Sequence, residues 1–280
     1  MRIGKREFEP KGHTYVMGIL NITPDSFSDG GKWNNRDSAL RHAEEMVAQG
    51  ADIIDIGGES TRPGYTFVPE EEEIERVAPV IEAVKAAFGV PVSLDTYKSR
   101  VALAGISAGA DLINDIWGLK YDPKMAEVIA QSGLPCCLMH NRDNTEYRHL
   151  MTDVTSDLAQ SLWQAREAGI GKEKIILDPG VGFGKTREQN LEVICRLEEL
   201  DKLGYPLLLG CSRKSVIGLT LDLPASERLE GTLVTTAWAV MKGCMFVRVH
   251  DVKENVRAVR MAEAIMGAGG QENCVCPEQV

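Results

Sequence analysis

The sequence predicts an α/β protein whose main domain is a (β/α)8 TIM barrel. Short apolar runs alternate eight times with segments of helical periodicity, as expected for parallel strands that are buried on both faces. The length of 280 residues is close to the roughly 250 residues typical of this barrel. Polar residues follow the predicted strands, directly in seven cases and after Gly57-Gly58 in the other. A barrel uses the C-terminal ends of all its strands, so we favour it over an open doubly wound sheet.

The strands and helices follow from these patterns. The predicted strands are Tyr15–Leu20, Asp52–Ile56, Val90–Leu94, Asp111–Ile113, Pro135–Met139, Lys174–Leu177, Pro206–Leu209 and Cys244–Val249. The predicted helices are Arg36–Gln49, Glu70–Phe88, Lys98–Ser107, Pro123–Ser132, Asp153–Ala168, Arg187–Leu203, Ser226–Met241 and Val252–Met266. Pro79 should kink or split the second helix. Glycines such as Gly50, Gly109 and Gly133 are expected to end helices in the left-handed conformation.

Three regions are expected along the chain. Residues 1–12 form an N-terminal segment, residues 13–267 form the barrel, and residues 268–280 form a glycine-rich and polar tail that should be disordered.

The composition restricts the partners of the protein. The chain has 31 Lys and Arg against 41 Asp and Glu, a net charge of −10, which argues against binding to nucleic acid. The longest stretch without a charged residue, Val128–Asn141, is shorter than the roughly 18 residues of a membrane span, so we expect no membrane partner. Without an apolar leader, we expect a cytoplasmic protein. The seven cysteines include no C-x-x-C pair, which predicts reduced thiols.

Three of the polar residues at strand ends form an acidic set. Asp95, Asn114 and Asp178 end three different strands and should meet at the mouth of the barrel. Carboxylate and carboxamide groups together can pair with a flat heterocycle that carries both donors and acceptors on its edge. Any one of these residues could instead cap the helix that follows it.

A second set is cationic. Ser212-Arg213-Lys214 follows the seventh strand, and Arg248 and His250 end the eighth, where barrels often bind phosphate. Arg248 and His250 should point to one face and Val249 to the other. This set predicts an anionic group on the ligand, with surface salt bridges as the alternative.

Several common motifs are absent. Residues 180–186 end like a phosphate-binding P-loop, but Pro179 occupies the position of its first glycine, and the G-x-G-x-x-G spacing also fails. The sequence contains no H-E-x-x-H and no G-x-S-x-G.

Seven ordered blocks of sequence resemble dihydropteroate synthase along nearly the whole chain. The blocks are 18–30, 55–64, 93–96, 113–116, 178–185, 210–214 and 247–251. The resemblance implies a transferase that joins 6-hydroxymethyl-7,8-dihydropterin diphosphate to 4-aminobenzoate, releasing diphosphate and forming 7,8-dihydropteroate for folate synthesis. The implied partners are these small molecules. A homodimer is also expected from the resemblance, in agreement with the apolar segment Leu233–Met241.

The resemblance also implies roles for individual residues. The pterin-binding residues are expected to be Asp95, Asn114, Met139, Asp178, Gly182 and Lys214. The diphosphate-binding residues are expected to be Asn21, Thr61, Arg248, Val249 and His250, with Asn21 acting through Mg²⁺. The aminobenzoate-binding residues are expected to be Thr61, Arg62, Phe183 and Ser212.

The implied reaction needs a neutralised leaving group and a shielded cation. Mg²⁺, Arg248 and His250 would stabilise the departing diphosphate, and closing loops would exclude water from the cationic pterin methylene. Asp25 is the candidate for stabilising that cation or organising the metal and its loop. Lys214 is expected to act as a hydrogen-bonding group and to form no Schiff base. The expected catalytic residues are Asp25, Lys214, Arg248 and His250.

Two other functions remain open from the sequence. A methyltetrahydrofolate-binding methyltransferase domain would share the acidic pterin set but would not need the segment 61–64 or the segment 212–214. An inactive relative that binds pterin or a protein partner is the other alternative. The polar stretch after His140, residues 141–149, departs from the family pattern, so its contacts cannot be transferred.

Overall fold

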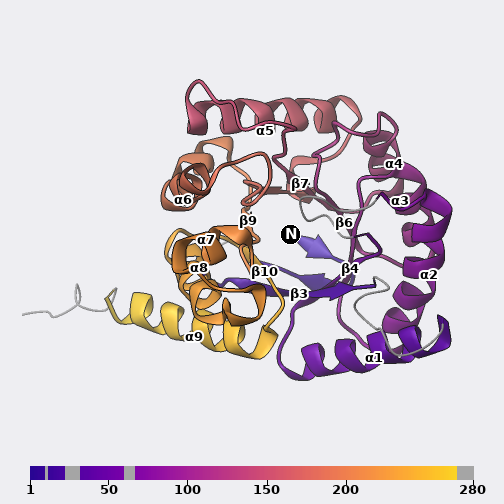
Figure 1. Cartoon of the computed structure of the whole chain (residues 1–280). Helices are drawn as coiled ribbons and strands as arrows, with labels where there is room; N and C mark the ends of the chain where they lie inside the picture. Colours follow the sequence, from indigo (N-terminus) through magenta and orange to yellow (C-terminus); the bar gives the residue numbers. More distant parts are fainter. Residues whose placement is uncertain (10–11, 23–31, 60–66, 270–280) are drawn as a thin grey trace, which may run out of the picture.

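The chain folds as an eight-stranded parallel barrel surrounded by helices. The computed structural model describes residues 1–9, 12–22, 32–59 and 67–269, and Figure 1 shows the helices packed around the outside of the strands. The strands lie in the order β8-β7-β6-β5-β4-β3-β10-β9. The parallel bridge between Leu177 and Leu207 joins β8 to the segment before β9 and closes the ring. The predicted barrel is therefore confirmed over the open sheet.

The described elements have the following bounds. The strands are β1 (Arg2–Ile3), β2 (Arg6–Glu7), β3 (Tyr15–Asn21), β4 (Ile53–Gly57), β5 (Val92–Asp95), β6 (Leu112–Asp115), β7 (Cys136–Met139), β8 (Ile175–Asp178), β9 (Leu208–Leu209) and β10 (Phe246–Val249). The α-helices are α1 (Lys32–Ala48), α2 (Glu70–Ala87), α3 (Ser99–Ser107), α4 (Met125–Ser132), α5 (Leu150–Glu167), α6 (Arg187–Cys195), α7 (Ser215–Leu221), α8 (Leu229–Met241) and α9 (Val252–Gly269). Three 3-10 helices are η2 (Lys172–Lys174), η3 (Leu197–Leu203) and η4 (Ala225–Glu227).

Two predicted helices are interrupted. The helix expected over residues 187–203 ends at Cys195 and continues as η3, because Arg196 leaves the helical conformation with φ −108° and ψ 26°. The tighter 3-10 turns let Leu197 and Leu200 both face the core. The helix expected over residues 226–241 begins at Leu229, after Arg228 has turned its guanidinium to the carbonyls of Leu223 and Arg213.

Two other helices differ from expectation. Helix α7 was not predicted, since its seven residues give too little periodicity. Helix α2 runs without a break through Pro79, so the expected split is wrong. Pro79 is exposed, so the hydrogen bond that its missing N–H cannot make is lost at the surface of the helix and not in the core. Gly50, Gly109 and Gly133 all have positive φ angles, as predicted for helix ends.

The barrel contains two separate layers of apolar side chains. Alternate strand residues face outward and pack beneath the helices, as Ile54, Ile56 and Val92 do. The inward residues near the N-terminal ends of the strands form a second core. This inner core contains Ile3, Phe8, Tyr15, Met17, Ile53, Leu112, Cys137, Ile176, Leu208, Met245 and Phe246.

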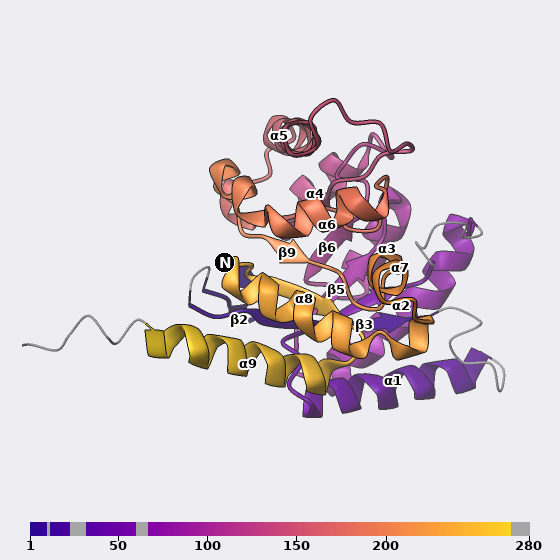
Figure 2. The ribbon, with the colours of Figure 1, turned by 60° about the vertical axis from the view of Figure 1, so that its left-hand side comes forward.

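The N-terminal hairpin of β1 and β2 belongs to this inner core. Met1 and Phe8 exchange backbone hydrogen bonds, and the N-terminus lies at the centre of the ring in Figure 1. The ring of Phe8 contacts Tyr15 and Phe246 at centroid distances of 4.8 and 5.6 Å. The hairpin therefore covers the opening of the barrel at the N-terminal ends of the strands, which we call its lower end. Figure 2 shows the hairpin after a turn of the molecule about the vertical axis.

The predicted division of the chain into three regions stays a prediction. The limits of 1–12, 13–267 and 268–280 remain predictions, although α9 extends to Gly269. The tail from residue 270 lies outside the described residues. Among the helices in the described ranges, none is long and apolar enough to span a membrane.

The packing of Phe8 generates a stability prediction. Phe8→Ala should lower the free energy of unfolding by about 3–5 kcal/mol, because it removes a buried ring and leaves a cavity. Urea unfolding followed by circular dichroism measures the change. Lys5→Ala, at an exposed position of the same hairpin, is the control. A Phe8→Ala protein as stable as this control would contradict the proposed closure.

Candidate active site

A charged layer lies directly above the apolar inner core. Asp55, Asp95, Asn114, Asp178 and Arg248 alternate along their strands with residues that face outward, such as Ile54, Ile56 and Val249. All four acidic or amide side chains are buried. The C-terminal half of the lumen is therefore polar, whereas the N-terminal half is apolar.

Arg248 joins two carboxylates of this layer. Its Nε donates to Oδ2 of Asp55 at 2.5 Å, and its Nη2 donates to Oδ2 of Asp95 at 2.6 Å. Asn114 reaches the same oxygen of Asp55 at 3.5 Å. Burial raises the pKa of Asp95 to about 7, with Arg248 acting against the rise and Asp55 adding to it. The guanidinium thus stabilises two buried negative charges that would otherwise repel each other.

Three polar atoms in this layer retain bonding capacity. Within the part of the chain that the structure describes, Oδ1 of Asp55, Oδ1 of Asp95 and Oγ of Ser93 are buried and have no hydrogen-bond partner. Buried polar atoms without partners are rare and costly in proteins. Two carboxylate oxygens and a hydroxyl group are therefore available to a ligand with N–H donors.

Asp178 and Lys214 form the opposite part of the charged layer. Oδ1 of Asp178 accepts from the backbone N–H of Gly180 at 2.7 Å, and Lys214 is its main cationic neighbour. Burial raises the pKa of Asp178 and lowers that of Lys214, and each charge opposes the shift of the other. Nζ of Lys214 donates to the carbonyl of Val181 at 2.6 Å and lies 4.7 Å from the centre of the Phe183 ring.

Gly182 explains how the Lys214 side chain fits. Its φ of +88° is unfavourable for other residues, and a Cβ atom there would lie 3.1 Å from Cδ of Lys214. Glycine at this position lets the backbone pass close to the lysine. The predicted pterin residue Met139 is also near, because it packs in a small cluster that Phe183 adjoins.

A cavity of about 390 Å³ opens above these residues. Its walls include the predicted residues Asn21, Gly182, Phe183, Ser212, Lys214, Arg248 and His250. Oγ of Ser212 lies 3.0 Å from Nδ1 of His250 and accepts from the backbone N–H of the same residue at 3.1 Å. Arg213 pairs with Asp251. Arg248 contacts Asp55 and Asp95, and Lys214 is the main cationic neighbour of Asp178, so these two cations of the wall serve the charged layer.

The loop that carries Phe183 is fixed by a buried lysine. Nζ of Lys185 contacts Nδ1 of His140 at 2.8 Å and donates to the carbonyls of Gly180 and Phe183, both at 3.0 Å. Nε2 of His140 lies 3.0 Å from Oδ2 of Asp157. Burial lowers the pKa of Lys185 to about 7 and that of His140 to about 4. His140 therefore supports the loop from behind and does not line the cavity.

Apart from the residues already placed around the cavity, the predicted site residues divide into three groups. Asp95, Asn114, Asp178, Lys214 and Arg248 are brought together, as the sequence predicts. The side chain of Val249 faces outward into the helix-covered core and does not line the cavity. Asp25, Thr61 and Arg62 lie outside the described residues.

Sequence reasoning assigned no role to Asp55, Ser93 and Lys185. The alternation of Ile53 and Asp55 against Ile54 and Ile56 contains a usable signal for the first of these, because it turns Asp55 into the lumen. The same reasoning would turn Ser93 inward beside Asp95. Lys185 carried no such signal, since its bonds depend on the conformation of a loop.

Comparisons with known proteins agree with this geometry. Residues 17–250 match the family described as pterin binding enzyme. The dihydropteroate synthase of Clostridium beijerinckii is 61% identical over 95% of this chain and 99% of its own.

Solved structures give the same result. A dihydropteroate synthase from Clostridium difficile, crystallised in the presence of pteroic acid, is 52% identical with a TM-score of 0.89, covering 95% of this chain and 98% of that one. The Xanthomonas albilineans dihydropteroate synthase with 4-aminobenzoic acid is 41% identical with a TM-score of 0.87, covering 91% and 93%. The chain therefore belongs to the pterin-binding enzyme family and, within it, to the dihydropteroate synthases.

Proposed function

We propose that the charged layer binds 6-hydroxymethyl-7,8-dihydropterin diphosphate and that the cavity above it admits 4-aminobenzoate. The observation that carries this proposal is the set of buried carboxylate oxygens on Asp55 and Asp95 that have no partner among the described residues. The aminopyrimidine edge of a pterin presents N–H donors to such oxygens. The related structures with pteroic acid and with 4-aminobenzoic acid support both halves of the proposal.

The acidic wall would hold the pterin ring. Asp95, Asn114 and Asp178 supply acceptors and a donor, and Lys214 supplies a donor near Asp178. The ring edge would bind Oδ1 of Asp95, because the guanidinium of Arg248 occupies only Oδ2 of that residue. The negative charge of the diphosphate would draw the guanidinium of Arg248 from Asp95 toward the mouth of the barrel.

The cationic mouth would receive the leaving group. The C–O bond between the pterin methylene and the diphosphate breaks, the amine nitrogen of 4-aminobenzoate forms the new C–N bond, and that nitrogen loses one proton. Arg248 and His250 stabilise the negative charge that develops on the diphosphate. Phe183, which lines the cavity, would cover the aromatic ring of the second substrate and exclude water.

Mg²⁺ is compatible with the donors present at this mouth. Asn21 lines the cavity together with Arg248 and His250. No group of three or more His, Cys, Asp or Glu residues in the described ranges could hold a metal ion. Mg²⁺ commonly uses one or two protein oxygens together with substrate phosphates and water. The amide oxygen of Asn21 would hold the ion, which neutralises diphosphate charge when bound.

The outer surface fits a homodimer. Helices α8 and α9 pack against each other, and both expose large apolar side chains. Val234 and Met241 on α8 are 68% and 52% exposed, and Met261 and Ile265 on α9 are 62% and 61% exposed. Apolar surface of this kind often marks a protein interface. We infer that a second copy of the chain covers it, as expected from the segment Leu233–Met241.

Substitution in the charged layer tests the proposed function. Asp95→Ala and Lys214→Ala should each lower kcat/KM by about 10²–10³-fold, because each removes a charged hydrogen-bonding partner of the pterin. Dihydropteroate formation and diphosphate release are measured together. Arg196→Ala, which removes an exposed ion pair, is the control. No coupled product from the wild-type protein, or wild-type turnover in either variant, would contradict the assignment.

Removal of divalent cations tests the role of Mg²⁺. Excess EDTA should abolish most product formation, and added Mg²⁺ should restore it, because the diphosphate then leaves with its charge neutralised. Asn21→Ala should raise the Mg²⁺ concentration needed for half-maximal rate. Full activity in EDTA would exclude a metal requirement.

The raised pKa of Asp95 predicts a pH dependence of pterin binding. Below pH 7 this carboxyl becomes protonated, so affinity should fall toward acid pH and level off above neutrality. Calorimetry with 6-hydroxymethyl-7,8-dihydropterin, which lacks the titrating diphosphate, measures this between pH 5.5 and 8.5. Asp95→Asn should make the dependence shallower. An equal affinity at both ends of the range in the wild type would refute the prediction.

A further inference from the structure

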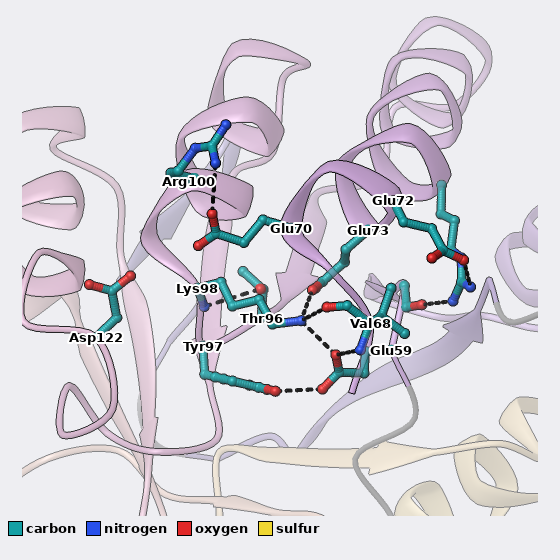
Figure 3. A network of polar contacts seen from close by, with 12 residues as sticks. Glu59, Val68, Glu70, Glu72, Glu73, Thr96, Tyr97, Lys98, Arg100 and Asp122 are labelled. Atoms are coloured by element: carbon teal, nitrogen blue, oxygen red, sulfur yellow. Dashed lines mark hydrogen bonds and ion pairs between the residues drawn. The ribbon is translucent and has the colours of Figure 1, made fainter. Parts of the chain in front are cut away.

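A second buried charge cluster lies between β4, α2 and the segment after β5. Figure 3 shows its three charged members, Glu59, Glu73 and Lys98, pointing toward one another. Their side chains are only 3%, 1% and 3% exposed. They come from three stretches that are distant in sequence. None of the three belongs to the pterin wall of Asp95, Asn114 and Asp178, and no step of the reaction described above uses them.

Lys98 uses all of its hydrogen-bonding capacity inside this cluster. Its Nζ donates to Oε2 of Glu59 at 2.5 Å, to Oε2 of Glu73 at 2.6 Å and to the carbonyl of Val68 at 2.6 Å. An ammonium group has three N–H donors, and three acceptors from three different parts of the chain receive them here. A guanidinium or an amide could not reproduce this arrangement.

The cluster holds both flanks of the segment 60–66. Glu59 directly precedes this segment, and Phe67 and Val68 directly follow it. Oε2 of Glu59 accepts from the backbone N–H of Val68 at 2.8 Å, while Lys98 binds the carbonyl of that same residue. The ammonium group also lies 4.5 Å from the centre of the Phe67 ring. The spacing between the two flanks is therefore set by Glu59 and Lys98.

The cluster also connects these flanks to the pterin wall. Lys98 follows Asp95 by three residues and directly precedes α3. Its neighbour Tyr97 donates from its hydroxyl to Oε1 of Glu59 at 2.5 Å, and the Tyr97 ring packs with Met139 in the cluster beside Phe183. Residues 95–98 therefore carry the proposed pterin ligand Asp95 at one end and Lys98 at the other. We call the cluster of Glu59, Glu73 and Lys98 the clamp.

The polar character of the cluster favours a positioning role. Burial raises the pKa of Glu73, which means that the site disfavours its charge even beside Lys98. Apolar residues of similar volume often match or exceed the stability of a buried ion cluster. Directional bonds, in contrast, fix one arrangement of the backbone. The neighbouring ion pairs of Arg100 with Glu70 and Glu71 differ from the cluster, because the Arg100 side chain is 61% exposed.

We propose that Glu59, Lys98 and Glu73 are positioning residues for 4-aminobenzoate, acting by fixing both flanks of the segment that contains Thr61 and Arg62. The proposal rests on the proposed function, because that function places Thr61 and Arg62 on the aminobenzoate side. Substitutions in the clamp should therefore change the binding of one substrate and leave that of the other unchanged. Loss of the clamp affects the second substrate, whereas the pterin wall built from Asp95, Asn114 and Asp178 stays assembled.

Steady-state kinetics with each substrate varied in turn tests the proposal. Lys98→Met should raise KM for 4-aminobenzoate at least tenfold while KM for the pterin diphosphate changes less than twofold. Glu73→Gln, which keeps the shape and removes one charge, should raise the same KM about threefold and carries the test if Lys98→Met does not fold. Arg100→Met is the matched control, and both KM values should remain at wild-type level.

Thermal unfolding of the same proteins separates positioning from structure alone. A folded Lys98→Met or Glu73→Gln protein with a lowered Tm but wild-type KM for 4-aminobenzoate would overturn the proposal, as would equal increases in both KM values. A wild-type protein that forms no dihydropteroate would overturn the proposed function together with the positioning role. Wild-type turnover with unchanged kinetics in both variants would overturn the positioning role alone.

Discussion

The ion pairs from Arg248 to Asp55 and Asp95 are the contacts on which the upper half of the barrel depends. A closed barrel of eight strands must fill its lumen with side chains. Here the upper layer holds three buried carboxylates, and burial alone would drive protons onto Asp95 and Asp178. Arg248 and Lys214 supply the compensating charge. The lumen can therefore keep charged groups ready for a polar ring.

The need to compensate buried charge explains why the two halves of the lumen differ. The lower lumen is closed by Phe8, Tyr15 and Phe246, which provide stability without polar atoms in need of a ligand. The upper lumen keeps Oδ1 of Asp55 and Oδ1 of Asp95 without partners among the described residues. Functional sites commonly retain such costly features because the ligand supplies what the protein lacks. Stability and binding thus occupy opposite ends of the same strands.

Much of this arrangement could be predicted from local patterns. The eight apolar runs that alternate with helical segments, together with the polar residue at each strand end, were enough to predict the barrel and to bring Asp95, Asn114 and Asp178 together. The ends of the helices were harder to predict. The break at Arg196 and the short helix α7 depend on tertiary contacts and leave little periodicity in the sequence. The clamp at Lys98 could not be predicted, since its three acceptors are distant in sequence.

The most direct test of the central claim is a crystal structure with 6-hydroxymethyl-7,8-dihydropterin diphosphate bound. We expect the ring edge to lie against Asp95, Asn114 and Asp178, with the guanidinium of Arg248 moved from Asp95 toward the diphosphate beside His250. A ring bound elsewhere, with Arg248 still bridging Asp55 and Asp95, would contradict the account.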